Sequence, residues 1–164
     1  MSGLSFSGKT TLARKISDAT GAPIVSYDEL FATTEREASV SGLDEWYLIT
    51  GLVDDHARAH LAAGRSVIVD SLNEDRIDRD RLRAIAADQG AEAIVVHVDV
   101  PLRLIEARRR DNDVTGARGT TEDDNFEFVL SRFEPPARPE RSIRYRAGDD
   151  VDEWLRRLLE LVAV

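Results

Sequence analysis

The stretch Gly3-Leu4-Ser5-Phe6-Ser7-Gly8-Lys9-Thr10 fits the pattern G-x-x-x-x-G-K-[ST], which is the phosphate-binding P-loop. Glycines at both ends of such a loop allow backbone angles and a close approach to ligand that a Cβ atom would block. The backbone amides then point inward and surround phosphate oxygens. A chance match arises in well under ~1% of chains of this length at average composition. The pattern therefore predicts nucleotide binding, and it requires a loop that leads directly into a helix.

The residues of this loop have separate expected contacts with a nucleotide. Lys9 is expected to place its positive charge on the β- and γ-phosphates, and the Thr10 hydroxyl is expected to ligate Mg²⁺. The other expected nucleotide-binding residues belong to the loop or directly follow it: Gly3, Ser5, Phe6, Ser7, Gly8 and Thr11. The pattern from Gly8 to Ala19 predicts a helix, whose positive N-terminal end would also face the anion.

Length and composition fit one P-loop domain over residues 1–164. The chain is 42% hydrophobic and 32% charged, and its 164 residues are enough for a single sizeable core. It has no apolar run of 18 residues, no signal-peptide pattern and no cysteine, so we expect a cytoplasmic protein without membrane spans, disulfides or a thiolate metal site. The net charge of −9 argues against a large nucleic-acid surface.

Short apolar runs alternate with helical patterns along the rest of the chain. The predicted strands are Pro23–Tyr27, Ser66–Asp70, Ala93–Val98 and a weaker Ser142–Arg146. The predicted helices cover residues 8–19, 43–61, 74–89, 101–111 and 122–133, with a last one capped by Asp149-Asp150. Such alternation predicts the α/β class, here a three-layer P-loop NTPase fold with a mostly parallel sheet.

The first strand of that fold is short in this sequence. A P-loop normally follows a buried strand of about five apolar residues, but only Met1 and Ser2 precede Gly3. We therefore expect this strand to be missing or truncated to a stub. Its absence would leave the neighbouring strands with unpaired backbone groups, so we expect an upstream apolar segment or another part of the chain to fill the gap.

Three aspartates follow or end predicted strands, where ligands bind in an open α/β sheet. Asp28 is the candidate base that accepts a proton from a substrate hydroxyl, and a helix N-cap is its alternative role. Asp70 is the candidate for holding a Mg²⁺-bound water together with Thr10, and a cap is again the alternative. For Asp99, which precedes Val100-Pro101, the expected role is a turn or a cap.

A cluster of arginines predicts a lid near residues 108–121. Arg108-Arg109-Arg110 end one predicted helix, and Arg118 lies in the following stretch Asp113–Thr121, which contains two glycines. A loop there can close over a nucleotide, and Arg110 and Arg118 are the candidates for stabilising the charge of the transferring phosphoryl group. The alternative is that these cations only complement the dipole of a helix C-terminus.

Four segments together resemble a known family. They are the P-loop, Val25-Ser26-Tyr27-Asp28, Val67-Ile68-Val69-Asp70-Ser71-Leu72-Asn73 and Arg132-Phe133-Glu134-Pro135-Pro136. In combination they resemble the P-loop kinases of the AAA-domain "predicted kinase" group, which is similar to polynucleotide 5′-hydroxyl kinases and, more distantly, to zeta toxins and chloramphenicol phosphotransferase. The resemblance covers nearly the whole chain. It implies that Asp28 activates an acceptor hydroxyl and that lid arginines bind phosphates.

One position departs from the polynucleotide kinases. In them an arginine usually follows the strand-end aspartate by three residues, whereas this chain has Phe31. That difference weakens the expectation of a nucleic-acid acceptor, and the acidic composition weakens it further.

Three functions are compatible with these features. The first is an ATP- and Mg²⁺-dependent kinase that transfers the γ-phosphoryl group to a hydroxyl of a small molecule. The second is a polynucleotide 5′-hydroxyl kinase, and the third is an ATP-binding switch or ATPase without an acceptor. A GTPase would need an Asn-Lys-x-Asp segment, but no lysine occurs after Lys15. An ATPase commonly has a glutamate after the strand-end aspartate, where this chain has Ser71. Both absences favour transfer to an acceptor.

Overall fold

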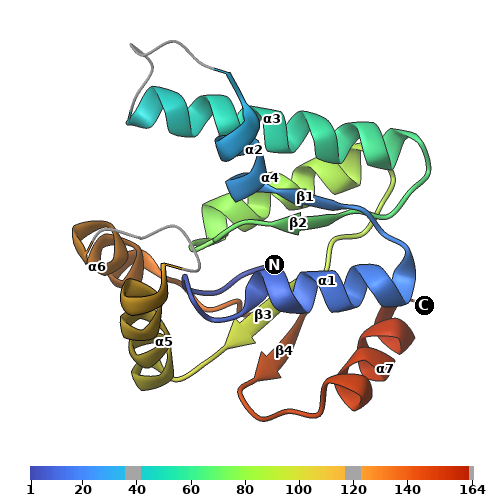
Figure 1. Cartoon of the computed structure of the whole chain (residues 1–164). Helices are drawn as coiled ribbons and strands as arrows, with labels where there is room; N and C mark the ends of the chain where they lie inside the picture. Colours follow the sequence, from blue (N-terminus) through green and yellow to red (C-terminus); the bar gives the residue numbers. More distant parts are fainter. Residues whose placement is uncertain (36–41, 117–122, 163–164) are drawn as a thin grey trace.

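A computed structural model describes residues 1–35, 42–116 and 123–162 (Figure 1). The elements follow the chain in the order α1 (Lys9–Thr20), β1 (Ile24–Ser26), α2 (Tyr27–Thr33), α3 (Leu43–Ala62), β2 (Ile68–Asp70), α4 (Arg76–Asp88), β3 (Val95–Asp99), α5 (Leu102–Thr115), α6 (Asp123–Arg132), β4 (Ser142–Arg146) and α7 (Val151–Val162). Within the described ranges, no helix is both long and apolar enough to cross a membrane.

The four strands form two parallel pairs, β1 with β2 and β3 with β4. In the first pair Ser26 lies opposite Asp70, and in the second Asp99 lies opposite Arg146. Each of these residues is the last of its strand, so both pairs end in register. The carboxyl ends of parallel strands are where an open α/β sheet binds its ligands.

The first residues of the chain join the two pairs into one sheet. The Ser2 N–H donates to the Val96 carbonyl of β3 at 2.8 Å, and the Ser2 carbonyl accepts from the Val98 N–H at 2.9 Å. On the other side, the Met1 amine donates to the Val69 carbonyl of β2 at 2.6 Å. Figure 1 shows this end of the chain between the two pairs. The predicted truncated first strand is therefore confirmed, and its residues partly fill the gap.

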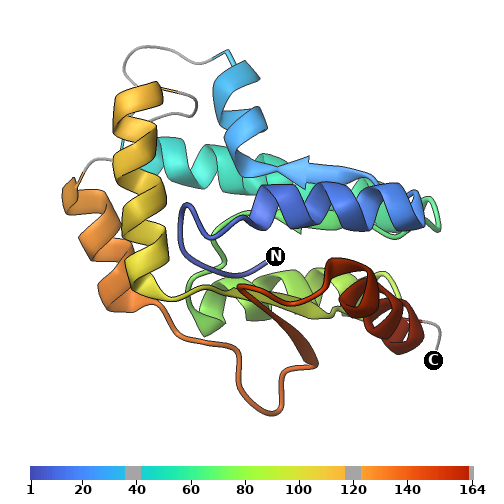
Figure 2. The same cartoon turned by 60° about the horizontal axis from the view of Figure 1, so that its bottom comes forward.

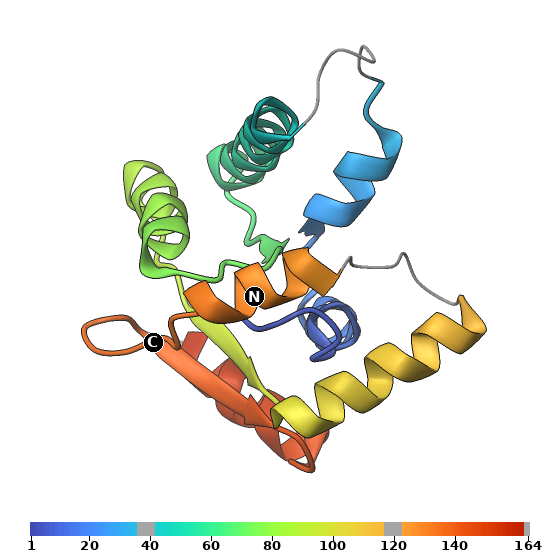
Figure 3. The same ribbon diagram turned by 90° about the vertical axis from the view of Figure 1, so that its left-hand side faces the viewer.

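Helices cover both faces of the sheet, which confirms the predicted three layers. On one face α3 packs against α4 and β1, and on the other α1 packs against β1 and β2 (Figure 3). A core cluster lies on the α1 face and combines apolar side chains of several elements, among them Leu12, Ile16, Val96, Val98, Ile105, Phe126, Trp154 and Leu158. Trp154 is fully buried, and its indole N–H donates to the Arg144 carbonyl at 2.8 Å.

Two boundaries differ substantially from the predicted ones. β1 ends at Ser26 and Tyr27 begins α2, a helix that the sequence does not predict, because its seven residues are too few to show a helical period. α5 continues to Thr115, so the first residues of the predicted loop 113–121 are helical. Residues 36–41, and residues 117–121 of the predicted loop, lie outside the described ranges.

Residues added before Met1 test whether the short pairing at the stub limits the stability of the sheet. Five alternating valines and threonines would continue the stub between Val67–Val69 and Ile94–Val96. We expect the melting temperature to rise by several degrees, because each kcal/mol shifts it by about 2–4 °C in a domain of this size. Five added glycines and serines are the control, since they disfavour strand pairing. Equal melting temperatures of the two extended proteins, measured by calorimetry, would contradict the expectation.

Candidate functional site

The P-loop lies between the stub and α1, beside α5 and α6 (Figure 2). Gly3 has a φ of +149°, and a Cβ there would stand 2.9 Å from the Val98 carbonyl oxygen, so the close approach to β3 requires glycine. Gly8 has a φ of +102° at the N-cap of α1. Phe6 also has a positive φ of 62°. For a non-glycine residue this left-handed conformation costs roughly 1–2 kcal/mol, so the loop must be stabilised by contacts outside Phe6.

Polar groups of the loop face inward. The Lys9 ammonium donates to the Leu4 carbonyl at 2.9 Å, and the Ser7 N–H donates to the same oxygen at 3.2 Å. These bonds close the loop over the start of α1. The Ser7 side chain is 3% exposed, yet its Oγ has no hydrogen-bond partner among the described residues. Because a buried hydroxyl without a partner is costly, Ser7 is suited to bind a ligand.

A cavity of about 460 Å³ opens beside the loop. Thr11 and Lys15 of α1, Arg108 and Asn112 of α5, and Tyr145 of β4 line it together with the loop. This volume lies within the range of about 300–1,000 Å³ that is usual for small-molecule sites. The helical period places Thr11 above Lys15, and Arg108 above Asn112, one turn apart. The sequence contains no signal that these two helix faces oppose each other.

Asp28 and Asp70 leave neighbouring strands at the same end of the sheet. Asp70 is 5% exposed and ends β2, whereas Asp28 is exposed in the first turn of α2, two residues after Ser26. Neither aspartate caps a helix. Ser26 caps α2 by accepting from the Glu29 N–H at 3.3 Å, and Asp75 caps α4 by accepting from the Asp78 N–H at 3.0 Å. The alternative role as a cap is therefore wrong for both Asp28 and Asp70.

Asp99 does not cap a helix either. It ends β3, and its carboxylate lies 3.6 Å from the Arg144 guanidinium of β4. The N-cap position of α5 is Pro101. The expected role as a cap is therefore wrong for Asp99, which instead forms an ion pair between two exposed side chains. Asp150, from the predicted cap Asp149-Asp150, does cap α7, since it accepts from the Glu153 N–H at 2.8 Å.

The oxygen ligands near the loop fit Mg²⁺ only if a phosphate supplies further oxygens. Thr10 is the second residue of α1, and the carboxylate of Asp70 is buried at the end of β2. Hydroxyl and carboxylate oxygens are donors that Mg²⁺ prefers, and it commonly takes one or two of them plus substrate phosphates. No group of three or more metal-binding side chains occurs among residues 1–35, 42–116 and 123–162. These residues thus suit an ion shared with a nucleotide.

A buried arginine holds the loop that follows Asp70. The Arg79 guanidinium of α4 donates to the Asn73 carbonyl at 3.2 Å and to the Glu134 carbonyl at 2.9 Å. It also donates twice to the Glu140 carboxylate, at 2.7 and 3.1 Å. Both charged side chains are almost completely buried. Such a pair is tolerated because nearly every donor and acceptor is satisfied.

Asn73 transmits this support to the P-loop. Its Nδ2 donates to the Met1 carbonyl at 2.6 Å, and its own carbonyl accepts from the Ser2 hydroxyl at 3.1 Å. The Gly3 N–H donates to the Leu72 carbonyl at 3.3 Å. The segment that carries Asp70 and the start of the P-loop are thus held together by hydrogen bonds, which fixes the two relative to each other.

The segment Arg132–Pro136 contacts the same region. The Arg132 guanidinium donates to the Asp75 carboxylate at 2.8 Å, and the Glu134 N–H donates to the Glu74 carbonyl at 2.8 Å. The Arg76 N–H also donates to the Glu134 carboxylate, across 58 residues of chain. The two segments therefore lie side by side. This contact connects the end of α6 to the loop after β2.

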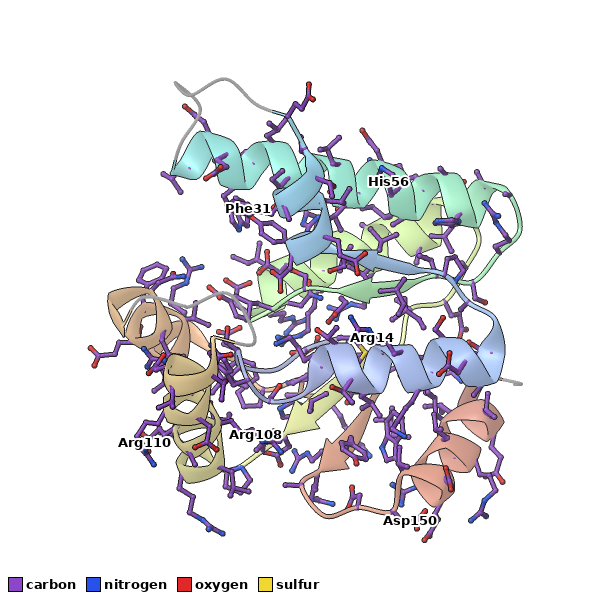
Figure 4. All side chains as sticks on the ribbon, in the orientation of Figure 1. Arg14, Phe31, His56, Arg108, Arg110 and Asp150 are labelled. Atoms are coloured by element: carbon purple, nitrogen blue, oxygen red, sulfur yellow. The ribbon has the colours of Figure 1, made fainter. Side chains whose placement is uncertain are left out.

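The three consecutive arginines of α5 point in different directions. The Arg108 guanidinium donates to the carbonyls of Phe6 and Ser7, whereas that of Arg109 lies 4.6 Å from the ring centre of Phe126 on α6. Figure 4 shows Arg110 on the outer side of α5, opposite Arg108. Arg118 lies outside the described residues. Arg108 thus reaches the P-loop in this arrangement.

Comparison with known proteins gives a family and a fold. Residues 1–136 match the model of the AAA domain family. No curated protein shows significant sequence similarity to this chain.

Solved structures are similar over nearly the whole chain. Kti12 from Chaetomium thermophilum, solved with ADP-AlF3, has a TM-score of 0.78 and 20% identity, covering 99% of this chain and 97% of that one. An APS kinase from Mycobacterium tuberculosis, solved with AMPPNP and APS, has a TM-score of 0.72 and 19% identity, with coverages of 99% and 95%. A sugar kinase from Janibacter sp. HTCC2649 has a TM-score of 0.67 and 24% identity, with coverages of 99% and 91%. At these identities the similarity establishes a shared fold.

The buried pair of Arg79 and Glu140 makes stability depend on pH. Hydrogen bonds from Arg79, opposed by burial, lower the pKa of Glu140 from 4.5 to about 2. A carboxylate whose pKa is lower in the folded state stabilises the fold above pH 4.5, and that contribution is lost as the pH falls toward 2. The difference in unfolding free energy between wild type and Glu140→Gln should therefore be largest near pH 6 and shrink toward pH 3.

Urea unfolding at several pH values measures this difference. Glu153→Gln, at an exposed position of α7, is the control that removes a carboxylate without a buried partner. The difference in unfolding free energy between wild type and Glu140→Gln should not stay constant from pH 6 to pH 3 if the expectation holds. A constant difference would show that ionisation of Glu140 does not contribute to stability.

Proposed function

The chain belongs to the AAA domain family, and from this premise we propose that it is an ATP- and Mg²⁺-dependent kinase that transfers the γ-phosphoryl group to a hydroxyl of a small molecule. One observation carries the proposal. The P-loop opens directly into the 460 Å³ cavity between α1, α5 and β4, so a phosphate cradle and a space for the rest of a nucleotide are continuous.

The donor nucleotide would bind along this continuous surface. Its phosphates would contact the inward amides of the loop, the buried Ser7 hydroxyl and the Lys9 ammonium. The base and ribose would occupy the cavity toward Asn112 and Tyr145. That Kti12 and the APS kinase, which share the fold, were solved with ADP-AlF3 and AMPPNP supports an adenine nucleotide.

Thr10 and Asp70 would hold Mg²⁺, Asp70 through a bound water. The ion, when bound, neutralises negative charge on the β- and γ-phosphates and helps to orient them. The protein supports this arrangement by fixing both donors. Thr10 belongs to the first turn of α1, and the loop after Asp70 is held by Asn73 and Arg79.

The acceptor would bind beyond the ends of β1 and β2, next to Asp28. Its hydroxyl oxygen would bond to the γ-phosphorus while the bond to the departing ADP oxygen breaks, and its proton would go to the Asp28 carboxylate. Asp28 is exposed, so a substrate can reach it. In line with such a transfer, Ser71 follows Asp70 where a hydrolysing ATPase commonly has glutamate.

The side chains beside Asp28 favour a small acceptor over a polynucleotide. Phe31 lies one turn after Asp28, and its ring stacks with that of Tyr27 at a centroid distance of 6.3 Å. Figure 4 shows Phe31 below α3, on the side of the molecule that holds the ends of the strands. An aromatic surface at this position offers no charge-assisted bond to a polynucleotide phosphate.

A lid near residues 108–121 would close over the bound nucleotide. We propose Arg110 and Arg118 as the cations that stabilise the transferring phosphoryl group. Closure would also exclude water from the phosphates, which limits hydrolysis in the absence of acceptor.

ADP release with and without acceptors tests the function. The purified protein would be incubated with Mg²⁺-ATP and pools of sugars, amino alcohols, nucleosides and an oligonucleotide with a free 5′-hydroxyl. The proposal expects slow ADP release alone and strong stimulation by one small-molecule pool, with a phosphorylated product in mass spectra. Stimulation by the oligonucleotide alone would identify a polynucleotide kinase. Fast ADP release that no pool alters would identify an ATPase.

Lys9→Ala should abolish most phosphoryl transfer and leave the fold intact. Removing a charge aimed at the transferring group costs about 10²–10³-fold in kcat, and Lys9 is only half-buried. Arg14→Ala, at an exposed position of the same helix, is the matched control for loss of a positive charge. Turnover by Lys9→Ala close to that of Arg14→Ala would contradict the assignment of the nucleotide site.

Asp28→Asn should lower kcat far more than it weakens ATP binding. Asparagine keeps the shape of the side chain but cannot accept the proton, and general-base catalysis contributes about 10²–10⁴-fold. Glu29→Gln removes a neighbouring exposed carboxylate on α2 and should leave kcat unchanged. If Asp28→Asn instead raised the KM for ATP at constant kcat, Asp28 would be a nucleotide ligand.

A further inference from the structure

Arg108 contacts the P-loop from outside the phosphate cradle. Its Nη1 donates to the Phe6 carbonyl at 3.0 Å and to the Ser7 carbonyl at 2.9 Å. A single nitrogen atom thus holds two successive peptide groups of the loop, across 102 and 101 residues of chain. The contact joins α5 to the loop, and nothing in the phosphate-binding pattern itself requires it.

The orientation of the two carbonyls determines the orientation of the following amides. In a planar trans peptide the carbonyl and the N–H point in opposite directions. With the Ser7 carbonyl turned toward Arg108, the Gly8 N–H points away from α5 and into the loop. With the Phe6 carbonyl turned the same way, the Ser7 N–H points to the Leu4 carbonyl, to which it donates at 3.2 Å. The two bonds of Arg108 therefore fix the peptide groups on both sides of Ser7, and with them the Gly8 amide that points into the loop.

The loop needs such a contact because its own backbone does not favour this shape. Phe6 has a φ of +62° and Gly8 a φ of +102°. The first is a disfavoured conformation for a residue with a Cβ, and the second is one of many that glycine can adopt. Without Arg108 the Phe6–Ser7 peptide group keeps only the bond from the Ser7 N–H to the Leu4 carbonyl, and the Ser7 carbonyl loses the donor that orients the Gly8 amide.

We propose that Arg108 is a positioning residue, which holds the P-loop in its phosphate-binding shape before the nucleotide arrives and thereby raises the affinity for polyphosphates. The inference rests on the proposed function, in which this loop binds the donor nucleotide. It gives Arg108 a different role from that of a lid arginine, because its bonds go to loop backbone instead of to the transferring phosphoryl group.

A pair of substitutions separates this role from direct contact with a ligand. Arg108→Met removes both bonds and keeps an unbranched side chain. Arg108→Lys should restore most of the effect, because both bonds come from one nitrogen and an ammonium group has three donors. Arg103→Met, at an exposed position of the same helix, is the control for the change in charge. Arg108 is itself exposed, so the variants are expected to fold.

Binding would be measured by calorimetry with Mg²⁺-ATP and, separately, with Mg²⁺-tripolyphosphate, which has no base or ribose. Arg108→Met loses the charge-assisted hydrogen bonds that organise the loop. Its affinity for both ligands should therefore fall by a similar factor, about tenfold. Arg103→Met should bind both as the wild type does. In the ligand-free protein, the Ser7 amide should exchange its hydrogen faster in Arg108→Met than in wild type or Arg108→Lys.

Two results would overturn the proposal. One is an unchanged exchange rate of the Ser7 amide in ligand-free Arg108→Met. The other is weaker binding of ATP with unchanged binding of tripolyphosphate, which would show that Arg108 contacts the base. If the wild-type protein bound neither ligand, the proposed function would fail, and the exchange experiment, which needs no nucleotide, would still decide whether Arg108 holds the loop.

Discussion

The two hydrogen bonds between Ser2 and β3 are the contacts on which the rest of the structure depends. They join the β3–β4 pair to a stub whose other side reaches β2 through the Met1 amine. Because the P-loop begins at the next residue, the same short segment completes the sheet and aims the loop. A change that weakens the pairing of the sheet must therefore also disturb the geometry of the loop.

Buried polar contacts extend this coupling toward the chemistry. A buried ion pair by itself is weak evidence for stability, because desolvation opposes its attraction. Arg79 does more than pair with Glu140, since its guanidinium also donates to the carbonyls of Asn73 and Glu134. Those bonds fix the loop after Asp70, and Asn73 in turn bonds to the Met1 carbonyl. The position of Asp70 relative to the P-loop thus depends on the buried charge of Arg79 in the first turn of α4.

The features that the sequence predicts well are those determined locally. The P-loop pattern, the alternation of strands and helices, and the truncated first strand each depend on neighbouring residues, and all are confirmed. The cap of α2 is not determined by the local pattern, because Ser26 and Asp28 are both good capping residues, and in the structure Ser26 is the cap. The cavity and the contact of Arg108 with Phe6 depend on how α5 packs against the P-loop, and Arg108 follows Phe6 by 102 residues. A local sequence pattern contains no information about such a distant contact.

The geometry of α5 limits which arginine can act on a transferring phosphoryl group. Successive residues of a helix are rotated by about 100°, so three consecutive arginines cannot face one site together. Here Arg108 faces the P-loop, Arg109 contacts Phe126 and Arg110 is on the outer side. Bringing Arg110 to the loop would require α5 to turn, which would break both bonds of Arg108 to the loop. The role proposed for Arg110 therefore requires that lid closure first releases Arg108 from the loop.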